Sequence, residues 1–332
     1  MPRADLVLEG GGIKGLGLVG AVLRLLREGY AFPRVAGTSA GSIVAAFLAA
    51  GADATQLEAI MGRLDYARVP DRAWPGVPGV SEGVALLRHR GAYRGDYARA
   101  FVAEELERLG VRTFADLRRR DAGADAAVPA HQRHKLVVMV TDVTRGRMLR
   151  LPWDYPLLGL DPDAQPVADA VRASMSIPLY FEPVTVRHPQ TGEETTLVDG
   201  GVLSNFPIEV FDRTDAREPR WPTFGVKIIP ALPAGDAELF PGVALPALPP
   251  VHLLEQVVAT AVFGNDQTYL ERPCVRRRAI QVDTSAVGVV EFDASAEQRA
   301  TVLRNGEEAA GRFLAGWDWE AFKADCAHAG EA

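Results

Sequence analysis

The chain has 332 residues, of which 48% are hydrophobic and 24% are charged, and its formal net charge is −7. These proportions are typical of a globular protein and exclude global disorder and collagen-like repeats. The acidic balance, with a pI of about 5.5, argues against a nucleic-acid-binding protein. The two cysteines, Cys274 and Cys326, are far apart and lack metal-site spacing, so neither a disulfide framework nor a zinc module is expected.

The first fifty residues predict the order strand, loop, helix, strand, turn, helix. Residues 6–8 form a short apolar run, which is typical of a buried strand, and the glycine-rich run 10–15 follows. Apolar residues between 18 and 26 recur at helical spacing. A second strand is expected at 34–36, and a second helix at 43–50.

Later parts of the chain alternate apolar runs with helical patterns, which predicts an α/β protein. Strands are expected at 136–140, 196–198, 224–229 and 280–282, and helices at 97–109, 167–174, 253–270 and 296–314. Because no composition break marks a second domain, we expect one domain. Its catalytic core would span 5–230, and 231–332 would continue it with a proline-rich loop, helices and one further strand.

Two parallel strands joined by a helix place their carboxyl ends at one edge of a sheet. The glycine-rich turns at 10–15 and 37–41 each follow such a strand end. Open α/β sheets build their sites at this edge, and both following helices would direct free N–H groups towards it.

The segment Gly37-Thr38-Ser39-Ala40-Gly41 fits G-x-S-x-G, the motif of a nucleophilic serine on a tight turn. The motif is weak alone, but here it lies between a predicted strand and a predicted helix, as the chemistry requires. Ser39 is therefore the candidate nucleophile, and the N–H of the next residue, Ala40, is a candidate oxyanion donor.

The run Gly10-Gly11-Gly12-Ile13-Lys14-Gly15 predicts a loop whose successive N–H groups bind one oxyanion, with Lys14 adding positive charge. The alternative is a tight turn that serves only helix–sheet packing. A dinucleotide site is disfavoured because the second strand ends in Ser39 rather than in an acidic residue. A P-loop is disfavoured because no Ser or Thr follows Lys14-Gly15.

A nucleophilic serine needs a base. None of the six histidines has a compelling setting. Asp199 ends an apolar strand and precedes Gly200 and Gly201, so we expect it at the same sheet edge, with room beside it for Ser39 and a substrate. The alternative role for Asp199 is to cap its own turn.

Together the glycine run, the Ser39 turn and Asp199-Gly200-Gly201 resemble the three signatures of patatin-like phospholipases. The segments Ala173–Pro178 and Thr141–Gly146 resemble that family too, and the likeness extends to about Ile229. The resemblance implies a three-layer α/β/α fold with a mostly parallel central sheet, and a Ser39–Asp199 dyad. It also implies Gly10, Gly11 and Gly12 as the oxyanion loop, Lys14 as a basic position, and no cofactor or metal. Gly15, Gly37, Gly41, Gly200 and Gly201 would support these groups.

The resemblance implies a lipid acyl hydrolase that cleaves fatty-acyl esters of glycerophospholipids through an acyl-enzyme. The alternatives are a soluble lysophospholipase or acyl thioesterase with the same dyad, and a non-catalytic lipid-binding protein. The apolar run 157–160 and the proline-rich stretch 230–250 are expected to line an acyl groove, or else to be surface loops. The expected partner is a lipid or membrane-surface substrate rather than a nucleic acid, and an unidentified activator is compatible with the sequence.

No apolar run reaches the length of about 18 residues that a membrane span needs, and no signal peptide is apparent. The expected location is the cytoplasm, either free or peripheral at a membrane, and leaderless secretion is compatible with the same sequence.

Overall fold

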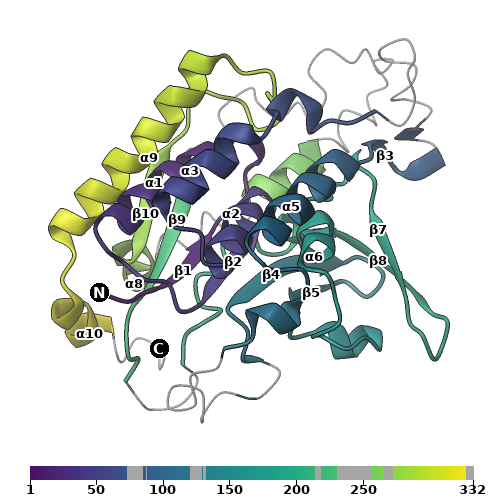
Figure 1. Ribbon diagram of the computed structural model, residues 1–332, viewed down its shortest axis with the longest axis horizontal. Coiled ribbons are helices and arrows are strands. Elements are labelled where there is room, and N and C mark those ends of the chain that lie inside the picture. The colour runs from purple at the N-terminus through teal and green to yellow at the C-terminus, as the bar shows by residue number, and fades with distance from the viewer. Residues whose placement is uncertain are drawn as a thin grey trace.

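The computed structural model describes residues 1–72, 85–86, 88–119, 129, 132–213, 218–229, 256–264 and 272–326. Within these residues, the chain builds one large mixed sheet with helices packed against it (Figure 1). The strands are β1 (Asp5–Leu8), β2 (Val35–Thr38), β3 (Gly91–Tyr93), β4 (Leu136–Asp142), β5 (Arg147–Leu151), β6 (Leu179–Phe181), β7 (Val184–Arg187), β8 (Glu194–Asp199), β9 (Thr223–Ile229) and β10 (Ala279–Asp283).

The large sheet has eight strands in the order β10-β9-β1-β2-β4-β8-β7, with β5 also paired to β4. The pairs from β10 to β4 are parallel, whereas β4–β8, β7–β8 and β4–β5 are antiparallel. The predicted α/β class with a mostly parallel central sheet is therefore confirmed. A small separate sheet pairs β3 with β6.

The helices gather mainly on one face of the large sheet, where α9 runs beside α1 (Figure 1). They are α1 (Gly15–Arg27), α2 (Ala40–Ala49), α3 (Ala54–Arg63), α5 (Asp96–Arg108), α6 (Val167–Ser174), α8 (Pro273–Arg277), α9 (Ala296–Gly316) and α10 (Trp319–Cys326). No helix among the described residues is long and apolar enough to cross a membrane.

The central strands are buried on both faces, which is why they read as continuous apolar runs. Alternate residues of β1 belong to different cores: Leu6 and Leu8 face the helical layer, and Val7 faces a smaller second cluster. That second cluster contains Phe206 and Phe211, together with Val275 of α8. The sheet is thus covered on both sides, in agreement with the expected three-layer architecture.

The predicted strands and helices in the described residues are present, with small shifts at their ends. The helix expected at 253–270 is described only over 256–264, which are helical and include a π-helical turn. The sequence analysis missed β3, β5, β6, β7, α3, α8 and α10. Several of these strands are short or half-exposed, so they lack the apolar runs from which the others were predicted.

Asp199 is the last residue of β8, as expected, although β8 runs antiparallel to β4. The register nevertheless brings this residue to the right level. Thr38 of β2 pairs with Met139 of β4, and the next residue of β4, Val140, pairs with Asp199. Asp199 therefore lies level with Ser39, two strands away in the sheet.

Cys274 of α8 and Cys326 of α10 form a disulfide with a Cα–Cα distance of 5.7 Å. The sequence analysis expected no disulfide framework. It did not pair these two cysteines because a separation of 52 residues is not a recognisable disulfide pattern. The bond ties the last described helix to the face of the sheet opposite the main helical layer. Disulfides persist mainly in oxidising compartments, so this bond does not favour the expected cytoplasmic location.

We predict that Cys326→Ser lowers the free energy of unfolding by about 2–4 kcal/mol, because the crosslink restricts the unfolded chain. Urea unfolding followed by circular dichroism measures the change. Reductant should lower the stability of the wild type to that of the variant and leave the variant unchanged. Equal stability of the wild type with and without reductant would show that the bond contributes nothing.

Candidate functional site

Ser39 lies at the tight turn between β2 and α2, with φ 49° and ψ −126°. Such a conformation costs a residue with a side chain about 1–3 kcal/mol, so its surroundings must hold it in place. The Ser39 N–H donates to the Ser174 hydroxyl at 2.9 Å, and its carbonyl accepts from the Ser42 hydroxyl at 2.6 Å. The predicted strand–serine–helix geometry is therefore present.

The surroundings of Gly41 explain why this turn requires a glycine two residues after the serine. A Cβ at Gly41 would lie 2.4 Å from the carbonyl oxygen of Glu9 and 2.5 Å from that of Leu8. The first turn of α2 therefore packs directly against the end of β1. This contact places the Ser39 turn next to the glycine-rich loop.

The carboxylate of Asp199 is completely buried beside Ser39. Its Oδ1 accepts a hydrogen bond from the Gly201 N–H at 2.8 Å. Burial raises the pKa of Asp199 to about 7, while the Gly201 N–H and the Ser39 hydroxyl act in the opposite direction. Oδ2 has no hydrogen-bond partner among the described residues, while the Ser39 side chain lies near enough to the carboxyl to lower its pKa. One oxygen is thus fixed by the backbone, and the other is available to the serine.

The end of α6 and the turn that follows it hold both residues of this pair. Ser174 accepts from the Ser39 N–H and donates to the Met139 carbonyl at 2.6 Å. The Ser176 carbonyl accepts from the Asp199 N–H at 2.8 Å. The sequence analysis singled out this segment only through its resemblance, and these hydrogen bonds now give it a physical role.

The glycine loop lies beside Ser39, but its three leading glycines are not equivalent. The Gly10 N–H donates to Asn205, at 3.1 Å to Oδ1 and 3.3 Å to the carbonyl. Gly10 is therefore not available as an oxyanion donor, which corrects that part of the expectation. Within the described residues, the N–H groups of Gly11, Gly12 and Ala40 have no hydrogen-bond partner.

Gly12 has φ +55°, and a Cβ there would lie 2.1 Å from the Val289 carbonyl oxygen. Both the backbone conformation and the space therefore require glycine. The loop is held from this side by Val289, whose carbonyl also accepts from the Ile13 N–H at 3.1 Å. Its shape is set by backbone contacts from a segment nearly 280 residues later in the chain.

Lys14 is fully buried and does not line the pocket that contains Ser39. It lines a small cavity of about 10 Å³ behind the glycine loop, together with Glu9, Asn205 and Val289. Its charge lowers the pKa of Asp283, although hydrogen bonds from Ser285 have the larger effect. Lys14 thus places a positive charge behind the loop rather than at the pocket surface.

The remaining predicted glycines occupy the contacts between these segments. Gly15 begins α1 and lines the pocket, and Gly37 lies in β2 before the serine turn. Gly200 packs against the Met139 carbonyl, and Gly201 donates to Asp199. The structure therefore brings together all the residues that the sequence analysis selected, with Gly10 and Lys14 behind the pocket rather than in it.

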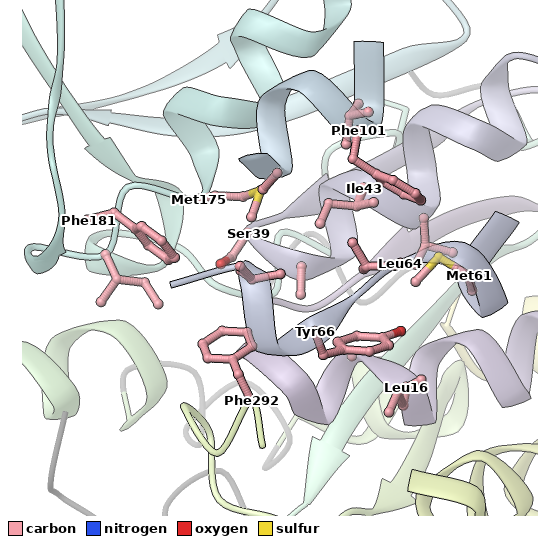
Figure 2. Close-up of a pocket in the computed structure, with 18 residues that line it drawn as sticks. Leu16, Ser39, Ile43, Met61, Leu64, Tyr66, Phe101, Met175, Phe181 and Phe292 are labelled. Atoms are coloured by element: carbon pink, nitrogen blue, oxygen red, sulfur yellow. The ribbon is translucent and has the colours of Figure 1, made fainter. Parts of the chain in front are cut away.

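Ser39 opens into an apolar pocket with an internal volume of about 50 Å³ (Figure 2). Helices α2, α3 and α5, the turn after α6, and the segment before α9 supply its walls. Figure 2 shows Met175 and Phe181 on one side of Ser39 and Phe292 on another, with Leu16 and Met61 farther away. Such a pocket suits a hydrocarbon chain whose ester lies at Ser39.

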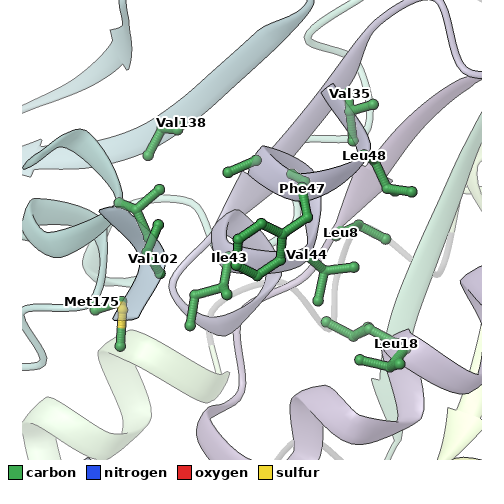
Figure 3. Packing of buried hydrophobic residues seen from close by; sticks show 14 of the residues in the cluster. Leu8, Leu18, Val35, Ile43, Val44, Phe47, Leu48, Val102, Val138 and Met175 are labelled. Atoms are coloured by element: carbon green, nitrogen blue, oxygen red, sulfur yellow. The ribbon is translucent and has the colours of Figure 1, made fainter. Parts of the chain in front are cut away.

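Helix α2 connects this pocket to the main core. Phe47 is fully buried and meets Phe101 of α5 edge to face, with ring centroids 6.4 Å apart. Figure 3 shows Ile43 and Phe47 packed among residues of the neighbouring strands and helices. Because the helix is anchored by its apolar side chains, the Ser39 turn at its N-terminus is anchored too.

Of the two expected acyl-groove segments, 157–160 does not line this pocket. Leu158 is buried in the main core and Leu157 is 54% exposed, and neither lines the pocket. The stretch 230–250 lies outside the described residues. The pocket residues were missed because they look like ordinary core positions in the sequence, as Met61, Phe101 and Met175 do. Only their placement around Ser39 distinguishes them.

The buried histidine of the described residues pairs with an aspartate outside the site. His134 is buried, and its Nε2 lies 2.9 Å from an oxygen of Asp163 rather than near Ser39. The described ranges contain no cluster of three or more His, Cys, Asp or Glu side chains that could hold a metal ion.

Comparison with known proteins agrees with this geometry. A family model described as patatin-like phospholipase matches residues 6–212. The uncharacterized protein YqhO of Bacillus subtilis (strain 168) is 39% identical over 227 residues, which cover 68% of this chain and 71% of YqhO. The uncharacterized protein R571 of Acanthamoeba polyphaga mimivirus is 26% identical over 212 residues, covering 63% of this chain and 61% of R571.

Among solved structures, VipD from Legionella pneumophila has a similar fold, with a TM-score of 0.55 and 18% identity. The alignment covers 95% of this chain and 67% of VipD. At that identity the likeness concerns the fold alone. The family match over more than half of the chain and the identity with YqhO show that this chain belongs to the patatin-like phospholipase family.

Proposed function

We propose that this protein hydrolyses fatty-acyl esters of glycerophospholipids, as a phospholipase of the A type, through a Ser39–Asp199 dyad. The observation that carries the proposal is the contact between the serine turn and a buried carboxylate at an apolar pocket. Membership of a phospholipase family supports a lipid hydrolase in general. The dyad and the substrate class are the further steps of the proposal.

In the first half of the reaction, the Ser39 hydroxyl gives its proton to Asp199 Oδ2 as its oxygen bonds to the ester carbonyl carbon. The negative charge that develops on the carbonyl oxygen is stabilised by the N–H groups of Gly11, Gly12 and Ala40. The bond to the glycerol oxygen then breaks, and that oxygen takes the proton from Asp199. The products are an acyl-enzyme and a lysophospholipid.

In the second half, a water molecule gives a proton to Asp199 and attacks the acyl carbon. When the second tetrahedral intermediate collapses, the Ser39 oxygen leaves and takes that proton back from Asp199. The fatty acid departs and the dyad returns to its first state. An ordinary aspartate is a weak base for this task, and burial improves the match by raising the pKa.

We predict that Ser39→Ala and Asp199→Asn each reduce fatty-acid release from phospholipid vesicles by at least about 1000-fold, because each removes a group that takes part in bond formation. Chromatographic detection of released fatty acid measures the effect. Ser285→Ala, which changes an exposed serine after β10, is the matched control and should retain most of the activity. Equal release by wild type and Ser39→Ala would contradict the proposal.

Two further measurements, a comparison of monomeric with bilayer substrates and labelling by a fluorophosphonate, separate the related activities. A soluble lysophospholipase or thioesterase would act as fast on monomeric substrates as on bilayers. A non-catalytic lipid-binding protein would show no reaction of Ser39 with a fluorophosphonate.

We predict that the rate rises with pH to a plateau, with a midpoint near pH 7, because Asp199 accepts a proton only when it is ionised. Initial rates on a soluble ester between about pH 5 and about pH 9 give the profile. The contribution of Asp199 to folding stability changes with pH in the opposite direction. Because its pKa is higher in the folded state than in the unfolded state, this contribution is complete below the unfolded-state pKa of about 4 and is lost as the pH rises to about 7. A flat profile across this range would exclude Asp199 as the base.

We predict that Ala98→Leu, which adds bulk inside the pocket, lowers kcat/KM about 10-fold or more for hexadecanoyl esters and little for butanoyl esters. Ala100→Phe is the matched control, because this residue lies on the same helix but is exposed. A series of nitrophenyl esters measures the preference. If both variants keep the wild-type chain-length preference, the pocket does not hold the acyl chain.

A further inference from the structure

Asn205 forms a two-way amide pair with the backbone of Gly10. Its Oδ1 accepts from the Gly10 N–H at 3.1 Å, and its Nδ2 donates to the Gly10 carbonyl at 3.1 Å. The side chain thus satisfies both polar groups of the first residue of the glycine loop. Asn205 is 2% exposed, so water does not compete for these bonds.

The loop is narrowly confined at this point. A Cβ on Gly10 would lie 2.3 Å from Asn205 Oδ1 and 2.9 Å from the Ser39 Cβ. Gly10 therefore packs closely against both Asn205 and Ser39, with no room for a side chain between them.

Asn205 is itself fixed by a buried ion pair. Its Nδ2 lies 3.4 Å from Glu9 Oε1, which accepts from Lys227 Nζ at 2.6 Å. The other oxygen of Glu9 accepts from the Ile228 N–H at 2.5 Å. Glu9 and Lys227 are each 1% exposed. A buried ion pair is retained at a cost, and a role in fixing one geometry is a known reason for keeping it.

We propose that Asn205 is a positioning residue that holds the oxyanion loop against Ser39, with the Glu9–Lys227 pair fixing Asn205. This inference rests on the proposed hydrolase function, because Asn205 would affect catalysis by holding the N–H donors of Gly11 and Gly12 in place. It also explains why Gly10 is not itself a donor: its N–H attaches the loop to the segment that follows Asp199. The two halves of the site are thereby kept at a constant separation.

The test compares Asn205→Ala and Asn205→Ser with wild type. Asn205→Ser keeps a neutral hydrogen-bonding group at this position and adds no charge beside Glu9, so it covers the case in which the alanine variant does not fold. Asn305→Ala is the matched control, because Asn305 also donates to a backbone carbonyl, that of Asp283 at 2.9 Å, but lies on α9. The rate of Ser39 labelling by a fluorophosphonate, ester hydrolysis, and hydrogen exchange in residues 9–15 are measured for each.

We expect Asn205→Ala to lower kcat and the labelling rate about 10- to 100-fold, with KM changed less than about 3-fold, because a small displacement of the donors is enough. Asn205→Ser should lie between this variant and wild type, and Asn305→Ala should match wild type. The pH midpoint near 7 should stay unchanged, since Asp199 is not altered. Exchange in the loop should become faster in the Asn205 variants alone.

Unchanged labelling or unchanged loop exchange in a folded Asn205 variant would overturn the inference, as would a shifted pH midpoint, which would mean that Asn205 acts through Asp199. A wild type that neither hydrolyses lipids nor reacts with the fluorophosphonate would instead refute the proposed function. In that case loop exchange would still decide whether Asn205 holds the loop.

Discussion

The buried carboxylate of Asp199 is the constraint on which the rest of the structure depends. A carboxylate without exposure to water is costly to ionise, and here burial raises its pKa to about 7. The structure offsets the cost only in part, through the Gly201 N–H and the Ser39 hydroxyl. A more complete set of donors would make the group easier to ionise but would also make it a weaker base.

The strained turn at Ser39 is the second costly feature, and the two are held by the same framework. The backbone N–H groups of Ser39 and Asp199 donate hydrogen bonds to Ser174 at the end of α6 and to Ser176 just after it. Behind Ser39, α2 is anchored in the main core by Phe47. The packed sheet and helices thus provide the rigidity that an unfavourable local conformation and an unfavourable charge both require.

The pocket and the glycine loop divide the surroundings of Ser39 into an apolar side and a polar side. On one side, residues such as Met175 and Phe292 provide a hydrocarbon environment. On the other, Lys14, Glu9 and Asn205 form a buried polar group behind the loop. An ester with a long acyl chain matches this division, because its carbonyl oxygen would face the donors while its chain enters the pocket. The disulfide between α8 and α10 involves no residue that lines the pocket.

The sequence by itself determined the central strands, the serine turn, the glycine loop and the candidate base, because each has a local signature. Apolar runs mark strands buried on both faces, and glycines mark places where backbones approach closely, as at Gly12 and Gly41. The tertiary structure alone decided the antiparallel direction of β8 and its register with β4, which brings Asp199, the last residue of β8, level with Ser39. It also decided the pocket, the disulfide, and the pairing of Asn205 with Gly10, partners 195 residues apart. Such contacts depend on how distant segments pack, and a residue such as Met61 or Asn205 carries no local pattern that would announce its partner.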